Sequence, residues 1–292
     1  MSKYHRDIRI VLKYKIEIVS PVFNTEKIFP SLPQDDDGSS PADGSLKIIK
    51  NYFKPDTAIL KKDFGGGILI GREGSSYYGE IQGRSFRIDL EGRDVIIALP
   101  EDLAPEVIPN IPLDLGLMFF LKNYGYYPLH ASGGILNGKG ILFPGKTGSG
   151  KSTLAKTLYD SGGAILSDDR IFLNTISDEI YAHSFETELL LRGDDRQRKI
   201  KISPGSGRSV SIIKPQLLLF PVISGTDTPS LRGISPSDGM ERLLSLTLFA
   251  EKQEDLNFLS RLAQKCRLQE LALPEAGPDP SKVGRILVDS AL

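Results

Sequence analysis

The sequence predicts an α/β protein with a β-rich N-terminal domain over residues 1–110 and a second domain over residues 111–292. Two observations predict it. In the first part, short segments of alternating apolar and polar residues are separated by glycines, which is typical of strands joined by turns. After about residue 110, apolar strand-like segments alternate with segments of helical spacing, and that order is typical of an α/β fold.

The N-terminal part shows the period of two expected of half-buried strands. Apolar residues recur at every second position from Ile10 to Ile18 within residues 8–19, which predicts one strand. Further strand-like segments lie at residues 67–70, 76–82, 85–90 and 95–99. Glycines separate these segments, so we interpret them as a meander of hairpins.

The second part begins with residues 113–124, whose apolar residues have helical spacing after Pro112. Towards the C-terminus, Ser237 is a candidate N-cap of one helix, and residues 256–263 indicate another. Residues 268–273 read as a short strand. Cys266, between these segments, is interpreted as a small packing residue rather than a reactive thiol.

Composition excludes several functional classes. The chain is 40% hydrophobic and 25% charged, with a formal net charge of -1, so it has no overall attraction to nucleic acid or anionic membranes. No apolar run approaches the roughly 18 residues of a membrane span. A single cysteine excludes an intrachain disulfide and fits a reducing compartment. We therefore expect a cytoplasmic protein that binds neither nucleic acid nor membrane.

One segment matches the P-loop (Walker A) pattern of a glycine, four residues, glycine, lysine and serine or threonine. Its residues are Gly145, Lys146, Thr147, Gly148, Ser149, Gly150, Lys151, Ser152 and Thr153. Glycines adopt backbone angles closed to other residues, so the loop's N–H groups can turn inward around phosphate oxygens. We expect Lys151 to contact the β- and γ-phosphates of ATP and the Ser152 hydroxyl to ligate Mg²⁺.

The surroundings of the loop strengthen this interpretation. Residues 140–144 have the apolar composition of a buried strand, and residues 152–159 have helical spacing. Gly162 and Gly163 then end the helix. A strand before the loop and a helix after it place the positive helix N-terminus against the phosphates.

A short apolar strand at residues 164–166 leads to Ser167, Asp168 and Asp169. We expect the intervening helix to return the chain beside the P-loop strand, so that both carboxylates emerge at the ligand-binding edge of the sheet. One carboxylate would hold Mg²⁺ directly or through water, and the other would accept a proton from a hydroxyl. The alternative is that the acidic pair only begins a turn.

His130 lies in the segment 128–132, just before a turn at residues 137–140 whose Asn-Gly pair is a strong hairpin signal. The hairpin returns His130 to the level of the glycine loop. A histidine there could orient a carboxylate base or contact a phosphate. The alternative is a structural histidine.

Taken together, these segments resemble the catalytic domain of HPr kinase/phosphorylase, and more closely the HPr-kinase-like proteins of bacterial gene clusters. The shared features are Leu-His-Ala-Ser at residues 129–132, the Gly-Lys-Ser-Thr loop, and Leu-Ser-Asp-Asp at residues 166–169. The resemblance covers about residues 113–173. It implies a fold akin to phosphoenolpyruvate carboxykinase, with a P-loop in a mixed sheet, and ATP-dependent phosphorylation of a serine in a peptide or small protein.

The resemblance also implies roles for individual residues. Lys151 and Ser152 become the nucleotide and Mg²⁺ residues, Asp168 the base that accepts the serine proton, and Asp169 a metal-side carboxylate. His130 matches the family histidine near that base. HPr kinases assemble into oligomers, so a homo-oligomer is one option for this chain.

The chain departs from the family downstream. The family's later glutamate before Arg-Gly has no clean match, and Glu186 or Glu188 is the candidate for the metal role. The HPr-binding signature is absent, so HPr is not the expected substrate. In the basic segment 192–208, Arg208 is the first choice to neutralise charge on the transferring phosphoryl group. The alternative for that segment is a solvated loop.

Three functions therefore compete. The favoured one is a serine kinase acting on a peptide or small protein. The second is a small-molecule kinase, in which the basic segment 192–208 would cover the substrate. The third is a non-catalytic nucleotide sensor, with the N-terminal domain as a binding module.

Overall fold

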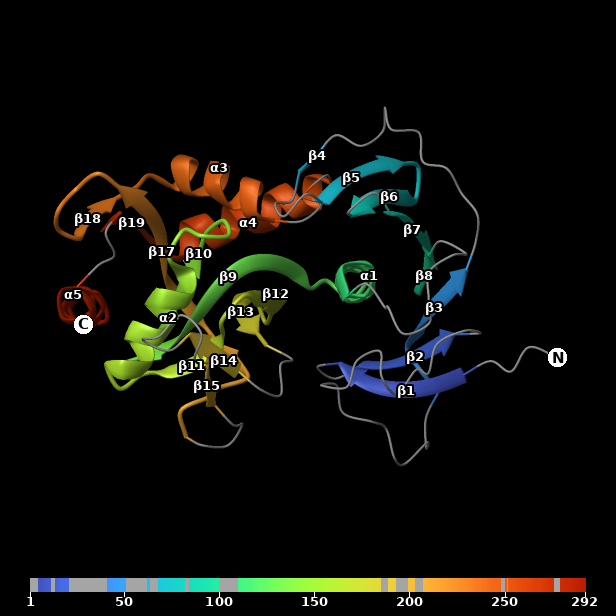
Figure 1. Cartoon of the computed structure of the whole chain (residues 1–292), viewed down its shortest axis with the longest axis horizontal. Coiled ribbons are helices and arrows are strands. Elements are labelled where there is room, and N and C mark those ends of the chain that lie inside the picture. The colour runs from blue at the N-terminus through green and yellow to red at the C-terminus, as the bar shows by residue number, and fades with distance from the viewer. Residues whose placement is uncertain are drawn as a thin grey trace. The chain divides into compact units, whose positions relative to one another are not determined.

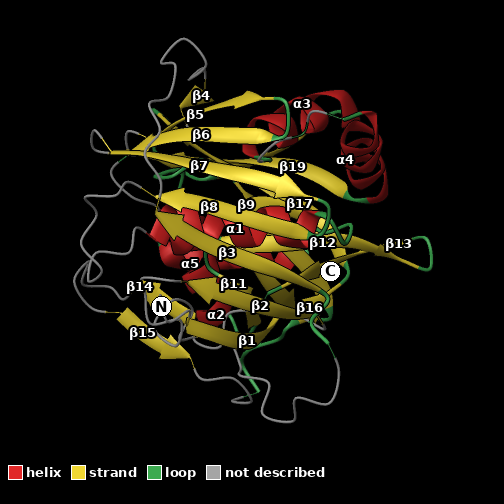
Figure 2. Ribbon diagram, turned by 90° about the vertical axis from the view of Figure 1, so that its right-hand side faces the viewer, coloured by secondary structure: helices red, strands yellow, loops and turns green. Residues whose placement is uncertain are grey.

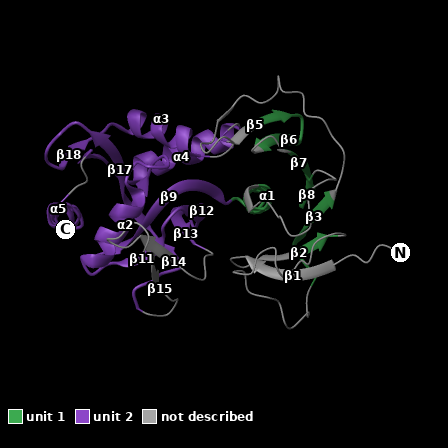
Figure 3. Ribbon diagram, viewed as in Figure 1, with its two compact units in different colours: residues 1–125 green, residues 126–292 purple. Residues whose placement is uncertain are grey.

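The structure is a computed structural model, and it describes residues 5–11, 14–20, 41–50, 62–63, 68–81, 84–99, 110–184, 189–192, 199–202, 207–247, 250, 252–275 and 279–292. The described residues form a mixed α/β protein with two large mixed sheets and five helices. By internal packing the chain divides into two compact units, residues 1–125 and 126–292 (Figure 3). None of the described helices has both the length and the apolar character needed to cross a lipid bilayer.

The first unit is an eight-stranded sheet with one described helix. The strand order is β1-β2-β3-β8-β7-β6-β5-β4. The bounds are β1 (His5–Val11), β2 (Tyr14–Ser20), β3 (Gly44–Lys50), β4 (Lys62–Asp63), β5 (Ile68–Glu73), β6 (Ser76–Ile81), β7 (Arg84–Glu91), β8 (Asp94–Leu99) and α1 (Asn110–Lys122). β5 to β8 form the predicted meander of antiparallel hairpins, and β4, which was not predicted, pairs antiparallel with β5. β3 pairs in parallel with both β2 and β8.

α1 belongs to this first unit, although the sequence assigned its residues to the second domain. It packs against β3, β7 and β8, where fully buried side chains such as Ile97 and Phe120 form the core. The helix starts before Pro112 rather than after it. Proline is accepted there because the first N–H groups of a helix have no intrahelical partner.

The prediction of one strand over residues 8–19 is wrong. The segment forms the antiparallel hairpin of β1 and β2, in which Ile8 pairs with Glu17 and Ile10 with Lys15. Successive side chains point to opposite faces in both strands of a hairpin, so a period of two is compatible with one long strand or with two short ones. The period alone therefore does not reveal where the chain reverses.

The second unit is built on a nine-stranded sheet. The order is β16-β13-β12-β9-β10-β17-β19-β18, with β11 also pairing with β9, and β14 and β15 form a separate two-stranded ladder. The bounds are β9 (Tyr127–Leu136), β10 (Lys139–Pro144), β11 (Ala164–Ser167), β12 (Arg170–Ile176), β13 (Glu179–His183), β14 (Leu189–Arg192), β15 (Lys199–Ile202), β16 (Ile212–Ile213), β17 (Pro215–Ser224), β18 (Ser230–Gly233) and β19 (Arg267–Pro274).

Helices cover both faces of this sheet (Figures 1 and 2). On one face, α2 (Lys151–Asp160) and α5 (Pro280–Ser290) bury residues such as Leu154 and Leu287 against β10, β17 and β19. On the other face, α3 (Pro236–Leu246) and α4 (Gln253–Lys265) bury residues such as Leu243 and Leu262. Apolar side chains on both faces explain the nearly continuous hydrophobic runs of the central strands.

The N-cap of α3 is Ser235, not Ser237 as the sequence suggested. The Ser235 hydroxyl accepts a hydrogen bond from the backbone N–H of Asp238 at 3.1 Å, and Pro236 occupies the first helical position. Both serines precede the apolar positions. Proline favours the first position of a helix, so Pro236 points to Ser235 as the cap.

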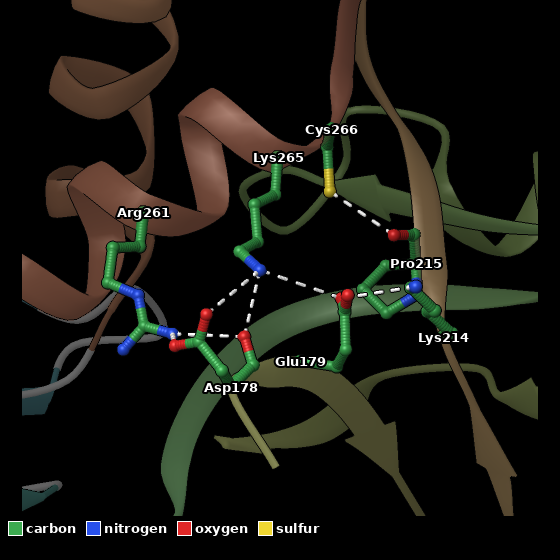
Figure 4. Close-up of polar contacts among 7 residues, drawn as sticks. All are labelled: Asp178, Glu179, Lys214, Pro215, Arg261, Lys265 and Cys266. Atoms are coloured by element: carbon green, nitrogen blue, oxygen red, sulfur yellow. Dashed lines mark hydrogen bonds and ion pairs between the residues drawn. The ribbon is translucent and has the colours of Figure 1, made fainter. Parts of the chain in front are cut away.

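The turn between β12 and β13 is clamped to α4 (Figure 4). Ser177 and Asp178 adopt left-handed backbone angles, with φ of 48° and 66°. The Arg261 guanidinium donates to the Asp178 carbonyl at 3.1 Å and to its carboxylate at 2.7 Å. Lys265 donates to the same carbonyl at 2.8 Å. Two side chains of α4 thus hold the far end of the strand that begins next to Asp169.

Cys266 ends α4 as a buried residue, in line with its interpretation from the sequence. Its thiol lies 3.4 Å from the Pro215 carbonyl oxygen (Figure 4), and burial raises the pKa of the thiol to about 12. We expect iodoacetamide at pH 8 to alkylate the native protein on the order of 10³ times more slowly than a free cysteine, because only the thiolate reacts. Mass spectrometry over time gives the rate. Denaturation should restore full labelling, and fast labelling of the native protein would contradict a buried thiol.

Candidate functional site

A glycine loop (residues 145–150) connects β10 to α2 in the second unit. Gly148 and Gly150 have φ of 84° and 103°, a region that other residues rarely adopt. A Cβ atom on Gly145 would lie 2.3 Å from the Ser149 hydroxyl, and one on Gly150 would lie 2.9 Å from Leu273 Cδ1. Substituting any of these three glycines would therefore distort the loop.

Lys151 is the first residue of α2 and is only 5% exposed. Its amine donates a hydrogen bond to the Lys146 carbonyl at 3.0 Å, inside the loop. Burial lowers the pKa of the Lys151 amine, and the negative charge of Asp169 acts in the opposite direction. A buried amine at a helix N-terminus is a strong local attraction for an anion.

The hydroxyl of Ser149 lacks a hydrogen-bond partner within the described part of the chain, although its oxygen is buried. An unpaired buried hydroxyl costs about 1–3 kcal/mol. An anionic oxygen bound in the loop would accept this hydrogen bond and remove the cost. The loop therefore fits a phosphate group, by its glycine conformations and by this unpaired donor.

β9 supports both ends of the glycine loop. The carbonyl of His130 accepts from the backbone N–H of Gly145 at 3.3 Å, and the Ser132 hydroxyl donates to the carbonyl of Lys151 at 2.9 Å. Ser132 is fully buried. Its support of Lys151 was not predicted. The available signal was that Ser132 lies two residues after His130, on the same side of the strand.

Asp168 and Asp169 lie in the bend between β11 and β12. The buried Ser167 hydroxyl accepts from the backbone N–H groups of Asp169 at 3.4 Å and Arg170 at 3.2 Å. The Asp169 carbonyl accepts from the N–H of Ala131 at 3.1 Å. These bonds fix the bend against β9, beside His130.

The strand that leads to this acidic pair does not pair with β10 as expected. β11 pairs with β9, and β9 lies between β11 and β10. Both pairings are antiparallel, so β11 still runs parallel to β10 and ends at the same edge of the sheet. The hairpin of β9 and β10, with Asn137 and Gly138 at positive φ, brings the intervening strand into place.

His130 contacts Asp169 rather than Asp168, the aspartate that the sequence assigned to it. The His130 Nε2 and Asp169 Oδ1 atoms are 2.9 Å apart. This hydrogen bond, helped by the positive charges of Lys151 and Arg170, holds the pKa of the Asp169 carboxyl below its usual value. The Asp169 side chain is 59% exposed and remains available to a ligand. The structure thus brings Lys151, Asp169 and His130 together.

Arg208 is not brought to the glycine loop. Its guanidinium donates to the carbonyls of Gly163, at 3.1 Å, and Tyr159, and lies 3.8 Å from the centre of the Tyr159 ring. These contacts are at the C-terminal end of α2, whereas Lys151 begins that helix. The ends of a ten-residue helix are about 15 Å apart. Glu186 and Glu188, the candidates for a further metal ligand, lie outside the described residues.

This position predicts a structural effect for Arg208→Ala. The variant loses a cation at a helix C-terminus and its stacking on Tyr159, so we expect a loss of about 1–2 kcal/mol in the free energy of unfolding. Chemical denaturation measures it, with Arg285→Ala on α5 as a surface control. Loss of phosphoryl transfer at unchanged stability would instead indicate the catalytic role expected from the sequence.

The side chains that would hold Mg²⁺ are the hydroxyl of Ser152, in the first turn of α2, and the carboxylate of Asp169. Among the described residues there is no cluster of three or more His, Cys, Asp or Glu side chains placed to hold a metal ion. In phosphoryl-transfer sites Mg²⁺ binds through one or two carboxylates together with substrate phosphates. The hydroxyl and the low-pKa carboxylate fit that donor set.

Comparisons with known proteins find a structural likeness but no match by sequence. No family model matches the sequence, and no curated protein sequence matches it. Among solved structures, the HPr(Ser) kinase/phosphatase from Coxiella burnetii is similar, with 16% sequence identity, 56% of this chain and 95% of that chain covered, and a TM-score of 0.34. The likeness is distant.

Proposed function

We propose that the second unit binds ATP with Mg²⁺ at the glycine loop and transfers the γ-phosphoryl group to a serine hydroxyl of a peptide or small protein. One observation carries this proposal. Lys151 is buried at the N-terminus of α2, directly after a loop with two left-handed glycines, and the His130–Asp169 pair lies beside it. The arrangement suits an anion that carries several negative charges.

Each part of the loop has a separate task in this proposal. Backbone N–H groups and the N-terminus of α2 bind the phosphate oxygens. Lys151 releases the Lys146 carbonyl and contacts the β- and γ-phosphates. Ser152 and Asp169 would hold Mg²⁺, which neutralises charge on the phosphoryl oxygens when bound. The low pKa of Asp169 keeps that carboxylate ionised at neutral pH.

In the proposed reaction the acceptor serine gains the phosphoryl group and loses its hydroxyl proton. The acceptor serine oxygen forms a bond to the γ-phosphorus as the bond from that phosphorus to the bridging oxygen of ADP breaks. The hydroxyl proton passes to the carboxylate of Asp168, which precedes the proposed Mg²⁺ residue Asp169 in the chain. His130 orients Asp169 through its hydrogen bond, so that the negative charge stays next to Lys151.

The test combines binding with transfer. Calorimetry measures the affinity for ATP and GTP with and without Mg²⁺, and γ-labelled ATP is offered with a pool of serine-containing peptides. We expect Mg²⁺-dependent binding and labelled phosphoserine with wild type, and labelling lowered by a factor of at least about 10² with Asp168→Asn. Binding without transfer to any peptide would refute the kinase. Absence of nucleotide binding would refute the whole proposal.

A further inference from the structure

β17 extends beyond the end of its neighbour β10. The two strands pair in parallel as far as Leu142 and Leu218, so Pro144, the last residue of β10, lies opposite Phe220. β17 continues to Ser224, paired with β19 on its other side. Within the described ranges no strand pairs with the β10 side of residues 221–224. We call these four residues the β17 edge.

The β17 edge begins where the glycine loop leaves the sheet, because Gly145 follows Pro144 directly. A second contact confirms that the two are neighbours. Ile223 pairs with Leu273 of β19, and the Leu273 side chain lies against Gly150, where an added Cβ atom would be 2.9 Å from it. Figure 1 shows β17 between β10 and β19. The edge is therefore next to the proposed phosphate site.

The side chains of this edge are apolar and exposed. Val222 is 36% exposed and Ile223 is 43% exposed, and there is no charged residue from 219 to 225. Natural proteins usually protect exposed sheet edges with charges or prolines. The outer strands of the same sheet follow that rule, since β18 contains Arg232 and Lys214 follows β16. Pro221 has no N–H to donate, and among the three residues after it, the N–H groups point alternately towards β19 and towards the unpaired side.

We propose that the phosphoryl acceptor binds as an extended peptide strand along the β17 edge, in line with β10, and so presents its serine to the glycine loop. The inference rests on the proposed kinase function and names its substrate class. Unpaired backbone groups of a strand are complementary to another strand, and apolar side chains give the specificity. Four residues span about 13 Å. We expect β-branched, uncharged residues around the acceptor serine.

The probe is a pool of seven-residue peptides with a central serine and Val, Ile, Thr or Ala elsewhere. The pool is offered to immobilised wild type with Mg²⁺ and a non-hydrolysable ATP analogue, and bound peptides are identified by mass spectrometry. Fluorescence anisotropy of the most enriched peptide then compares variants. Ile223→Asp should weaken binding at least tenfold. Ile212→Asp, equally exposed on β16, should leave binding within twofold, and nucleotide affinity should be the same in all three proteins.

A second measurement uses wild type alone, so it does not depend on the folding of a variant. N-methylation of successive backbone amides of the peptide should weaken binding at alternate positions, because alternate N–H groups of a strand face its neighbour. No enriched peptide on wild type, equal binding to Ile223→Asp, or no alternation would each overturn the proposed edge. A smaller sedimentation coefficient for Ile223→Asp than for wild type would also overturn the proposed edge. It would show that a second copy of the chain covers the edge in the wild-type protein.

The two proposals fail in different ways. Phosphoryl transfer is measured in parallel, on the same peptides. Transfer that is unchanged in Ile223→Asp overturns the edge as the acceptor site and leaves the kinase standing. Edge-dependent peptide binding without transfer supports strand docking and refutes the kinase.

Discussion

Replacing Lys151 with methionine is expected to lower kcat for phosphoryl transfer by a factor of about 10²–10³, the usual effect of removing one donor that stabilises transition-state charge. Nucleotide affinity should fall as well. The Lys151 amine is buried and its pKa is lowered by burial, so an apolar side chain of similar length should fit the same space without loss of stability. Radiolabel transfer and calorimetry measure the two losses.

The matched control is Lys146→Met in the same loop. Lys146 is exposed, and its carbonyl, not its side chain, accepts from Lys151. We expect this variant to keep transfer within about threefold of wild type. Equal losses in the two variants would show that general positive charge, rather than the buried amine, attracts the nucleotide. Full transfer by Lys151→Met would contradict the proposed site.

The second large effect is expected at the acidic pair, where the two carboxylates should lose different functions. Asp169→Asn removes the anion beside Lys151 but can keep the hydrogen bond to His130, because an amide oxygen also accepts. We expect transfer to fall by about 10²–10³ and the Mg²⁺ concentration for half-maximal rate to rise at least tenfold.

Asp168→Asn should lower transfer by about 10²–10⁴ without changing the Mg²⁺ dependence or the affinity for nucleotide, because its proposed role is to accept a proton. Titrating Mg²⁺ in both variants separates the roles. If the Mg²⁺ dependence moved in Asp168→Asn and not in Asp169→Asn, the two assignments would have to be exchanged. If neither variant changed transfer or the Mg²⁺ dependence, the acidic pair would have no catalytic role and would only begin a turn.

The local elements around the glycine loop were predictable because short-range chemistry determines them. Apolar residues before Gly145 predicted β10, helical spacing after Gly150 predicted α2, and Asn137-Gly138 predicted the hairpin that joins β9 to β10. Each signal lies within a few residues of the structure it specifies. The α/β class followed from the same patterns, and so did the approach of His130 to the level of the loop.

The contacts between distant segments were not predictable in this way. Nothing near residues 165–170 in the sequence specifies that β11 and β12 both pair with β9. The register that sets Arg170 opposite His130 brings the imidazole to Asp169 instead of Asp168. The basic composition around Arg208 suggested a phosphate contact, yet the chain returns to the opposite end of α2. The hydrophobic period along the sequence predicts which face of a strand is buried, but it does not predict which strand lies next to it.

The sequence by itself therefore determined the strand, glycine loop and helix, the acidic pair and the apolar character of the central strands, because backbone angles and hydrophobic periods depend on near neighbours. Only the tertiary structure decided which carboxylate lies beside Lys151, that Ser132 supports the helix start, and that β17 runs past β10. Those features depend on strand order and register, which are set by packing between residues far apart in the chain.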